Sequence, residues 1–158
     1  MTRTVFIIIA LLSSSIFANA QTELWQKQLL QKVNTLRQKG CKCGRKTFPP
    51  APKLTWDAKL EQSATNHAID MYKNKYFEHN SLNGDSYADR IDATGYNWKF
   101  SGENIAEGQK DVNEVFKDWF TSRTHCENMM NKDFRNMGAA QVKTYWVQDF
   151  GTLLPNKK

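Results

Sequence analysis

The 158-residue sequence lacks an apolar run long enough to cross a bilayer, which takes about 20 residues. It has no internal repeat, no low-complexity tract and no basic run interleaved with aromatic residues. These absences exclude repeat architectures and argue against a nucleic-acid partner, although the formal net charge is +6. We therefore expect one globular domain that is monomeric, has no membrane span and binds no nucleic acid.

Cysteine is scarce, and the number of cysteines is odd. Cys41, Cys43 and Cys126 are the three in the chain, so complete pairing within one molecule is excluded. A bridge between Cys41 and Cys43 would close a very small, strained ring. A long-range bridge to Cys126 would contribute roughly 4 to 5 kcal/mol in the loop-entropy model. We favour a bridge between Cys43 and Cys126, because the turn at Gly44 could present the Cys43 side chain to a partner. Cys41 is then the unpaired cysteine.

Histidine is equally scarce, and its three positions differ in character. His67 borders an apolar stripe beside Ala68 and Met71, so we interpret it as a packed residue. His125 directly precedes Cys126. Adjacent side chains on one helix or strand point in different directions, so this pair cannot form a nucleophilic dyad. A bridged cysteine also has no thiolate. The histidine of this pair is therefore the chemically interesting member.

The first twenty residues have the pattern of a signal peptide. Arg3 precedes a short apolar run, and Ala18-Asn19-Ala20 is a small-x-small cleavage pattern. Cleavage there would leave residues 21–158 as a single exported domain in the periplasm or outside the cell. Export would bring the cysteines into an oxidising environment, where a disulfide persists.

Hydrophobic periodicity predicts helices first and strands last. The predicted helices cover residues 22–39, 54–77, 87–94 and 111–122, with Thr55 or Asp57 capping the second and Asp111 the last. Residues 40–54 contain three prolines and are predicted as loop, and residues 125–131 as a turn. A short strand is expected within 95–108, and two antiparallel strands within 134–154 that meet near Lys143-Thr144. This order indicates an α+β fold with a small antiparallel sheet.

Polar residues that could form a site occur in motifs spread along the chain. "YFEHNSLNGDS" contains His79, "GENIAEG" contains Glu103, and "WFTSRTHCENMMNKDFRNMGAA" contains His125 and precedes "YWVQDFG". In this order the motifs resemble the CAP superfamily of cysteine-rich secretory, antigen 5 and pathogenesis-related proteins. The resemblance is closest to exported bacterial members and covers residues 25–151.

The resemblance implies a three-layer α-β-α sandwich and a cleft in which His79, Glu103 and His125 meet. Many eukaryotic members carry a second glutamate three residues after the tryptophan of the preceding helix. Counted from Trp119, that position is Ser122 in this chain. Three of the four cluster positions are therefore present, as in many bacterial relatives.

Two neutral imidazoles and a carboxylate suit a borderline divalent ion such as zinc, with open positions for water. We therefore predict His79 and His125 as metal ligands, with Glu103 as a further ligand or as a residue that orients one. Zinc-bound water beside a carboxylate is a minimal hydrolytic apparatus, so the same three residues are the candidates for catalysis. The sequence shows no evident nucleophile or oxyanion hole, and it assigns no enzymatic activity.

Two functions of other classes stay open. The superfamily includes members that bind lipids or sterols, so the chain could be a non-catalytic module for a lipid, another small ligand or a cell-envelope component. It could also be a structural surface module, in which the histidines and Glu103 form a hydrogen-bonded cluster that only stabilises the fold.

Overall fold

A computed structural model describes residues 24–155; the predicted signal peptide at residues 1–20 lies outside this range. The fold class is α+β, as expected from the sequence, but strands also precede and interrupt the helices, so the predicted order of helices first and strands last was wrong. In chain order they are a helix at residues 24–39, β1 (Cys41–Cys43), β2 (Lys46–Phe48), β3 (Thr55–Trp56), α2 (Ala58–Asn74), α3 (Tyr87–Ala93), β4 (Trp98–Glu107), α4 (Val112–Thr121), α5 (Arg123–Met130), β5 (Asn136–Val142) and β6 (Tyr145–Leu153).

The central sheet has four strands in the order β3-β5-β6-β4. β5 and β6 form an antiparallel hairpin, and its turn contains Lys143 with a positive φ of 56°. β4 pairs antiparallel with β6 and forms the outer strand on that side. β3 is a two-residue strand that runs parallel to β5, a pairing that the sequence did not predict. β1 and β2 form a separate small hairpin.

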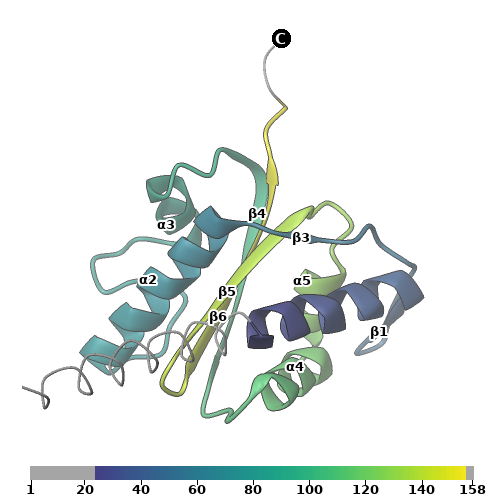
Figure 1. Cartoon of the computed structure of the whole chain (residues 1–158), viewed down its shortest axis with the longest axis horizontal. Coiled ribbons are helices and arrows are strands. Elements are labelled where there is room, and N and C mark those ends of the chain that lie inside the picture. Colours follow the sequence, from purple (N-terminus) through teal and green to yellow (C-terminus); the bar gives the residue numbers. More distant parts are fainter. Residues whose placement is uncertain (1–23, 156–158) are drawn as a thin grey trace, which may run out of the picture.

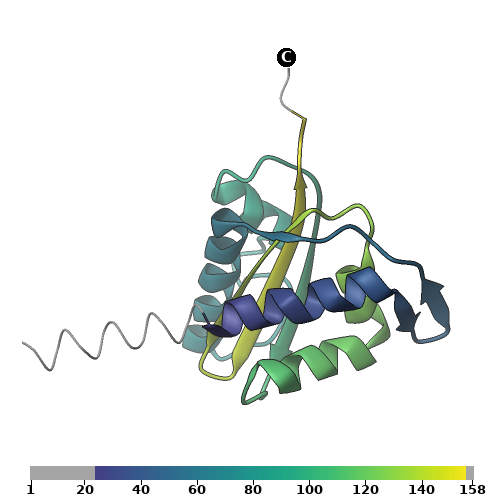
Figure 2. The ribbon, with the colours of Figure 1, turned by 45° about the vertical axis from the view of Figure 1, so that its right-hand side comes forward.

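Helices cover both faces of the sheet, so the fold is the predicted three-layer α-β-α sandwich. α2 lies along one face, with α3 beside it, and the helix at 24–39 lies with α4 and α5 on the other face (Figure 1, Figure 2). α2 buries Ala64, Ala68 and Met71 against Ile105 and Val147 of the sheet. This alternation of layers places one hydrophobic core on each side of the sheet.

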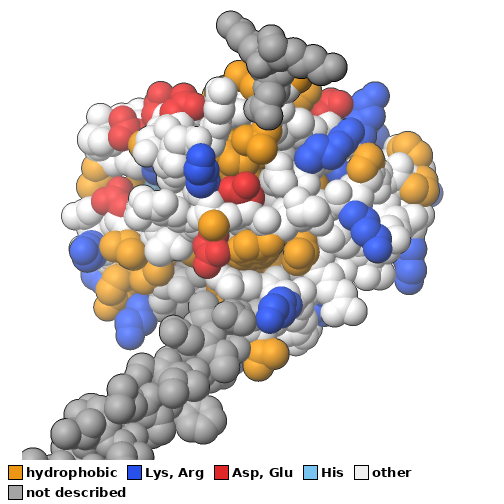
Figure 3. Space-filling model, turned by 45° about the horizontal axis from the view of Figure 1, so that its top comes forward, with side chains coloured by type: hydrophobic (Ala, Val, Ile, Leu, Met, Phe, Trp, Pro, Cys, Tyr) orange, Lys and Arg blue, Asp and Glu red, His pale blue; other side chains and the backbone are white. Residues whose placement is uncertain are grey.

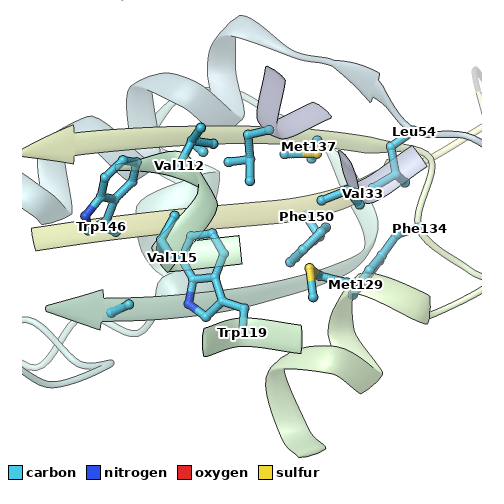
Figure 4. Close-up of a cluster of buried hydrophobic side chains, with 13 residues drawn as sticks. Val33, Leu54, Val112, Val115, Trp119, Met129, Phe134, Met137, Trp146 and Phe150 are labelled. Carbon is cyan, nitrogen blue, oxygen red and sulfur yellow. The ribbon is translucent and has the colours of Figure 1, made fainter. Parts of the chain in front are cut away.

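The larger core lies between the sheet and the helices at 24–39, α4 and α5. Figure 4 shows Val33, Val115, Trp119 and Met129 converging on the sheet around Phe150. Trp119 is 1 % exposed, and its indole N–H donates to the backbone oxygen of Ile105 at 3.2 Å. Its polar atom is therefore satisfied inside an otherwise apolar core.

Two helices begin at aspartates that cap them. The Asp57 side chain accepts from the backbone N–H groups of Lys59 and Leu60, which starts α2. Asp111 does the same for the first turn of α4. The side chains satisfy amide groups that the first turn of a helix leaves unpaired. Of the two capping residues predicted for α2, Asp57 is correct, whereas Thr55 lies in β3.

Two local predictions were wrong. Residues 40–54 are only partly loop, because Gly40 and Gly44 take positive φ values of 71° and 60° and turn the chain into the β1–β2 hairpin. The predicted turn at residues 125–131 is mostly helix α5. That helix buries Cys126, Met129 and Met130, whose i, i+3, i+4 spacing is helical. The strand within 95–108 is also longer than expected, since β4 spans ten residues.

One disulfide joins the β1–β2 hairpin to α5. It links Cys43 and Cys126, which are 83 positions apart, and Cys41 is a free thiol. This is the pair expected from the sequence. The bridge contacts Ala51 and Met130 in a small apolar cluster apart from the two main cores.

One face of the molecule carries its charge in dispersed form. On the face drawn in Figure 3, Lys and Arg side chains are scattered, with Asp and Glu side chains between them. Within residues 24–155, no helix combines the length and the apolarity that a membrane crossing requires.

Candidate functional site

Glu103 is the buried centre of the candidate site. It lies in β4, the outer strand, and its side chain is 0 % exposed. Its Oε1 accepts a hydrogen bond from His79 Nδ1 at 2.7 Å, and its Oε2 accepts one from Arg90 Nη2 at 2.6 Å. Because each carboxylate oxygen already has a cationic or polar partner, Glu103 is arranged to orient neighbouring side chains rather than to present a free oxygen.

Arg90 fastens the loop that carries His79 to the sheet. Its guanidinium comes from α3, is 8 % exposed, and forms the ion pair with Glu103. It also donates to the backbone oxygens of His79 and Asp85 and to the hydroxyl of Ser81. The loop after α2 is therefore held at three points by a single side chain whose charge is compensated by Glu103.

His79 projects from this loop into solvent. Its side chain is 52 % exposed, and the hydrogen bond to Glu103 raises its pKa above the ordinary value. The bond commits Nδ1 as the donor, which leaves Nε2 as the nitrogen that can bind a ligand when the ring is neutral. This is the arrangement of a carboxylate–histidine pair ahead of a metal ion.

His125 approaches from the opposite helical layer. It lies half-buried on α5, and its pKa is lowered by burial and by the charge of His79. The two histidines are thus electrostatic neighbours, although one follows α2 and the other belongs to a helix across the sheet. A lowered pKa keeps the His125 imidazole neutral near pH 7, which is the form that binds a metal.

Two asparagines hold α5 against β4. Asn104 Nδ2 donates to the backbone oxygen of His125 at 3.2 Å. Asn128 Nδ2 donates to the backbone oxygen of Glu103 at 3.0 Å and to Asn104 Oδ1 at 2.9 Å. These bonds fix the helix that carries His125 relative to the strand that carries Glu103.

Asp149 lies behind Glu103, directly opposite it in the pairing of β4 with β6. It is 0 % exposed, and neither carboxyl oxygen forms a hydrogen bond within residues 24–155, although the Ser63 side chain is near enough to lower its pKa. Burial and the negative charge of Glu103 raise its pKa well above the ordinary value. The raised pKa follows because ionising two neighbouring carboxylates in a buried site is costly.

His67 and Ser122 take no direct part in the cleft. His67 on α2 is 0 % exposed, its Nε2 donates to the backbone oxygen of Glu78 at 2.9 Å, and burial lowers its pKa. This matches the interpretation of His67 as a packed residue. Ser122 lies at the junction of α4 and α5, and its side chain makes no capping hydrogen bond there.

The cysteines are the only group of three metal-ligating residues within 24–155 whose ligand atoms all lie within 4.8 Å of one another. Two of these three sulfurs are joined in the disulfide and have no thiolate to offer. Within the described residues, the ligand atoms of His79, Glu103 and His125 do not all lie this close together.

The sequence model of the cysteine-rich secretory protein family, CAP, matches residues 30–150. The chain belongs to the CAP family. Among curated proteins, YkwD of Bacillus subtilis is 33 % identical over 135 residues, which are 84 % of this chain and 49 % of YkwD. The B. subtilis membrane protein YlbC is 30 % identical over 125 residues, 79 % of this chain and 34 % of YlbC. The chain thus spans half or less of the length of these relatives.

Solved structures also resemble this CAP domain. An extracellular protein with an SCP domain from Bacillus anthracis has a TM-score of 0.73 at 25 % identity, covering 82 % of this chain and 41 % of that one. An outer surface protein from Borrelia burgdorferi has a TM-score of 0.70 at 26 % identity, covering 81 % of this chain and 92 % of that one.

Sequence reasoning missed three residues around Glu103 in the candidate site. Arg90 gave no signal, because an arginine in a short polar helix is ordinarily a surface residue. Asn128 lay in a segment predicted as a turn. Asp149 did carry a weak signal, since it is the one carboxylate in "YWVQDFG", whose other residues apart from Gln148 are apolar or glycine.

Proposed function

We propose that this chain is an exported CAP domain that binds a divalent metal ion through His79 and His125, with Glu103 orienting His79. The observation that carries the proposal is the bond from His79 Nδ1 to the buried Glu103 carboxylate. It sets the tautomer and direction of His79 so that Nε2 is available, and histidines that bind metals usually donate their other ring N–H to a carboxylate in this way.

The electrostatics of the cleft fit a dication. Glu103 brings a negative charge close to His79, and the lowered pKa of His125 favours its neutral form. A zinc ion at such a site would act as a Lewis acid and acidify bound water. The chain's own contribution is to hold two imidazoles from opposite helical layers and to exclude water from behind Glu103. The same three residues remain the candidates for any hydrolytic activity.

A more distant relative supports the choice of zinc as the probe. The structure of NaASP2 was solved with Zn²⁺, and it shares the fold of this chain with a TM-score of 0.56 at 19 % identity. The relatives from B. anthracis and B. burgdorferi are described as an extracellular and an outer surface protein. Together with the signal-peptide pattern, these descriptions support residues 21–158 as one exported domain, periplasmic or extracellular.

Calorimetry near neutral pH tests the metal proposal. The chain is expected to bind about one zinc ion per molecule, because the two histidines form a single site. The double variant His79→Ala/His125→Ala should lose this binding, and each single variant should weaken it. Glu127→Gln is the matched control, because Glu127 is on α5 near His125 and its side chain only pairs with Arg123. Zinc binding that survives in the double variant contradicts the proposal.

A groove between the helix at 24–39 and α4 favours a second candidate function. It has a volume of about 480 Å³ and is lined by Gln28, Gln31, Lys32, Thr35, Leu36, Lys39 and Phe116. Apolar and cationic side chains together suit an amphipathic molecule with an acidic head group. Mass spectrometry of lipid extracted from the purified protein tests this. Lipid that is present in the wild type and reduced in Leu36→Gln/Phe116→Gln would favour it, whereas its absence from both excludes it.

A further inference from the structure

The free thiol of Cys41 lies against the disulfide. Its Sγ is 3.8 Å from the Sγ of Cys43 and 3.9 Å from the Sγ of Cys126. Cys41 is half-buried, whereas the two bridged cysteines are 0 % exposed. Three sulfurs are thus gathered where β1 meets α5, in a different part of the fold from the His79 cleft.

The geometry of β1 explains this gathering. Cys41 and Cys43 are two residues apart in a strand, so both side chains face the same side. That side faces α5, where Cys126 is buried. Apolar side chains, among them Leu36, Phe48 and Phe120, pack around the three sulfurs. Cys126 therefore has two potential partners on the same strand face.

We propose that Cys41, Cys43 and Cys126 form a site of thiol–disulfide exchange, at which the bridge moves from Cys43–Cys126 to Cys41–Cys126. The Cys41 thiolate attacks the Sγ of Cys126 and forms a new S–S bond. The bond between Cys43 and Cys126 breaks, and its electron pair leaves on the Sγ of Cys43. That thiolate takes up a proton equivalent to the one that Cys41 released, so nothing is oxidised or reduced overall.

Attack at Cys126 is favoured over attack at Cys43. Residues i and i+2 of a strand lie about 6.6 Å apart, at the upper end of the Cα separations that a disulfide spans. Their side chains also run parallel instead of converging. A Cys41–Cys43 bridge would therefore distort β1, whereas a Cys41–Cys126 bridge keeps the hairpin joined to α5.

Two features determine the rate of the exchange. Burial raises the pKa of the Cys41 thiol, so little thiolate is present at neutral pH. Cys41 Sγ is also almost equidistant from the two bridged sulfurs, so its side chain must rotate before the three sulfurs stand in line. The exchange should accelerate about tenfold per pH unit until the thiol pKa is reached.

Peptide mapping of the purified protein tests the site. The protein is held at about pH 8.5, where an ordinary thiol is half ionised, then acidified, and free thiols are blocked with N-ethylmaleimide. Trypsin separates Cys41 from Cys43, because Lys39, Lys42 and Arg45 surround them. The blocked thiol should lie on Cys41 at first and later be shared between Cys41 and Cys43. A label that stays on Cys41 at every time and pH overturns the proposal.

Two variants separate exchange within one molecule from other reactions. Cys43→Ser, oxidised with glutathione disulfide, should form the Cys41–Cys126 bridge and melt within a few degrees of the wild type. Cys41→Ser should show no free thiol. The wild-type rate should not depend on protein concentration. Free Cys41 and Cys126 in an oxidised, folded Cys43→Ser variant would contradict the proposal, as would a rate that increases with concentration. If Cys43→Ser does not fold, the wild-type map decides alone.

Discussion

At the scale of single residues, the candidate site contains two acidic residues that are paired across β4 and β6 but have different surroundings. Glu103 is an ion-pair partner of Arg90 and a hydrogen-bond partner of His79. Asp149, opposite Glu103 in the sheet, forms no side-chain hydrogen bond within residues 24–155. The difference follows from contacts, because the cationic and donor groups of α3 and the preceding loop reach Glu103, while Asp149 is enclosed by the sheet and α2.

Glu103→Gln is expected to affect stability and metal binding together. Arg90 would lose its buried charged partner, which should lower the free energy of unfolding by about 3 kcal/mol. The zinc affinity of the cleft should decrease about 10-fold to 100-fold, because His79 loses its orienting carboxylate. Urea denaturation and calorimetry measure the two effects. Glu107→Gln, an exposed position in the same strand, is the control and should change neither. Unchanged zinc affinity in Glu103→Gln would contradict the role of Glu103.

Asp149 should make stability depend on pH. Its folded pKa lies above its unfolded pKa, so its contribution is fully present below the unfolded pKa and is lost as pH rises through the folded pKa. Asp149→Asn does not titrate, so its stability relative to the wild type should increase by about 1.4 kcal/mol per pH unit between these two pKa values.

Urea denaturation at a series of pH values measures this dependence. The Asp149→Asn curve and the wild-type curve should converge at about pH 4, near the ordinary pKa of an aspartate. Asp92→Asn, at an exposed position on α3, should follow the wild type throughout. An Asp149→Asn variant that is less stable than the wild type at neutral pH would mean that Asp149 is ionised in the folded protein.

At the scale of elements, α5 decides whether the cleft exists, because it carries His125 and Cys126 together. The helix is eight residues long and is separated from α4 by one residue. A short segment of this kind with several polar residues resembles a turn in the sequence. The helical spacing of Cys126, Met129 and Met130 was the available signal. The hydrogen bonds from Asn128 that help fix α5 to β4 had none, since asparagine is usual in turns.

Asn128→Ala is expected to loosen α5. The variant loses the bonds to the Glu103 backbone and to Asn104, and it leaves the buried Asn104 side chain without this donor. The free energy of unfolding should decrease by about 1–3 kcal/mol. Glu127→Ala, one position earlier, removes only an exposed pair with Arg123 and should cost less than about 0.5 kcal/mol. Urea denaturation compares them, and equal losses would contradict the role of Asn128.

At the scale of the whole molecule, a few long-range links hold the helical layer of α4 and α5 to the N-terminal part of the chain. Arg37 is 0 % exposed and donates to the backbone oxygens of Pro52, Met129, Asn131 and Phe134. The disulfide adds a covalent link between β1 and α5. These links are needed because the hairpin and the loop after it have little apolar area of their own to bury.

Removing the disulfide should cost the molecule a large share of its stability. Cys126→Ser removes the bridge. It also removes the only cysteine outside β1, so Cys41 and Cys43 have no cysteine on α5 with which to form a new link. The free energy of unfolding should decrease by about 2–5 kcal/mol, as for other long loops closed by a disulfide. Urea denaturation without reductant measures it. Cys41→Ser keeps the bridge and should stay close to the wild type, and similar losses in the two variants would contradict this account.

The sequence by itself determined the four longer helical segments, the Asp111 cap and the β5–β6 hairpin. Each depends on residues that are neighbours in the chain, so the local pattern carries the information. The tertiary structure alone decided that Arg90 meets Glu103, that Asp149 lies behind it and that α5 brings His125 to the outer strand. These contacts join segments that are distant in the chain, and only the packing of two helical layers on one sheet brings them together.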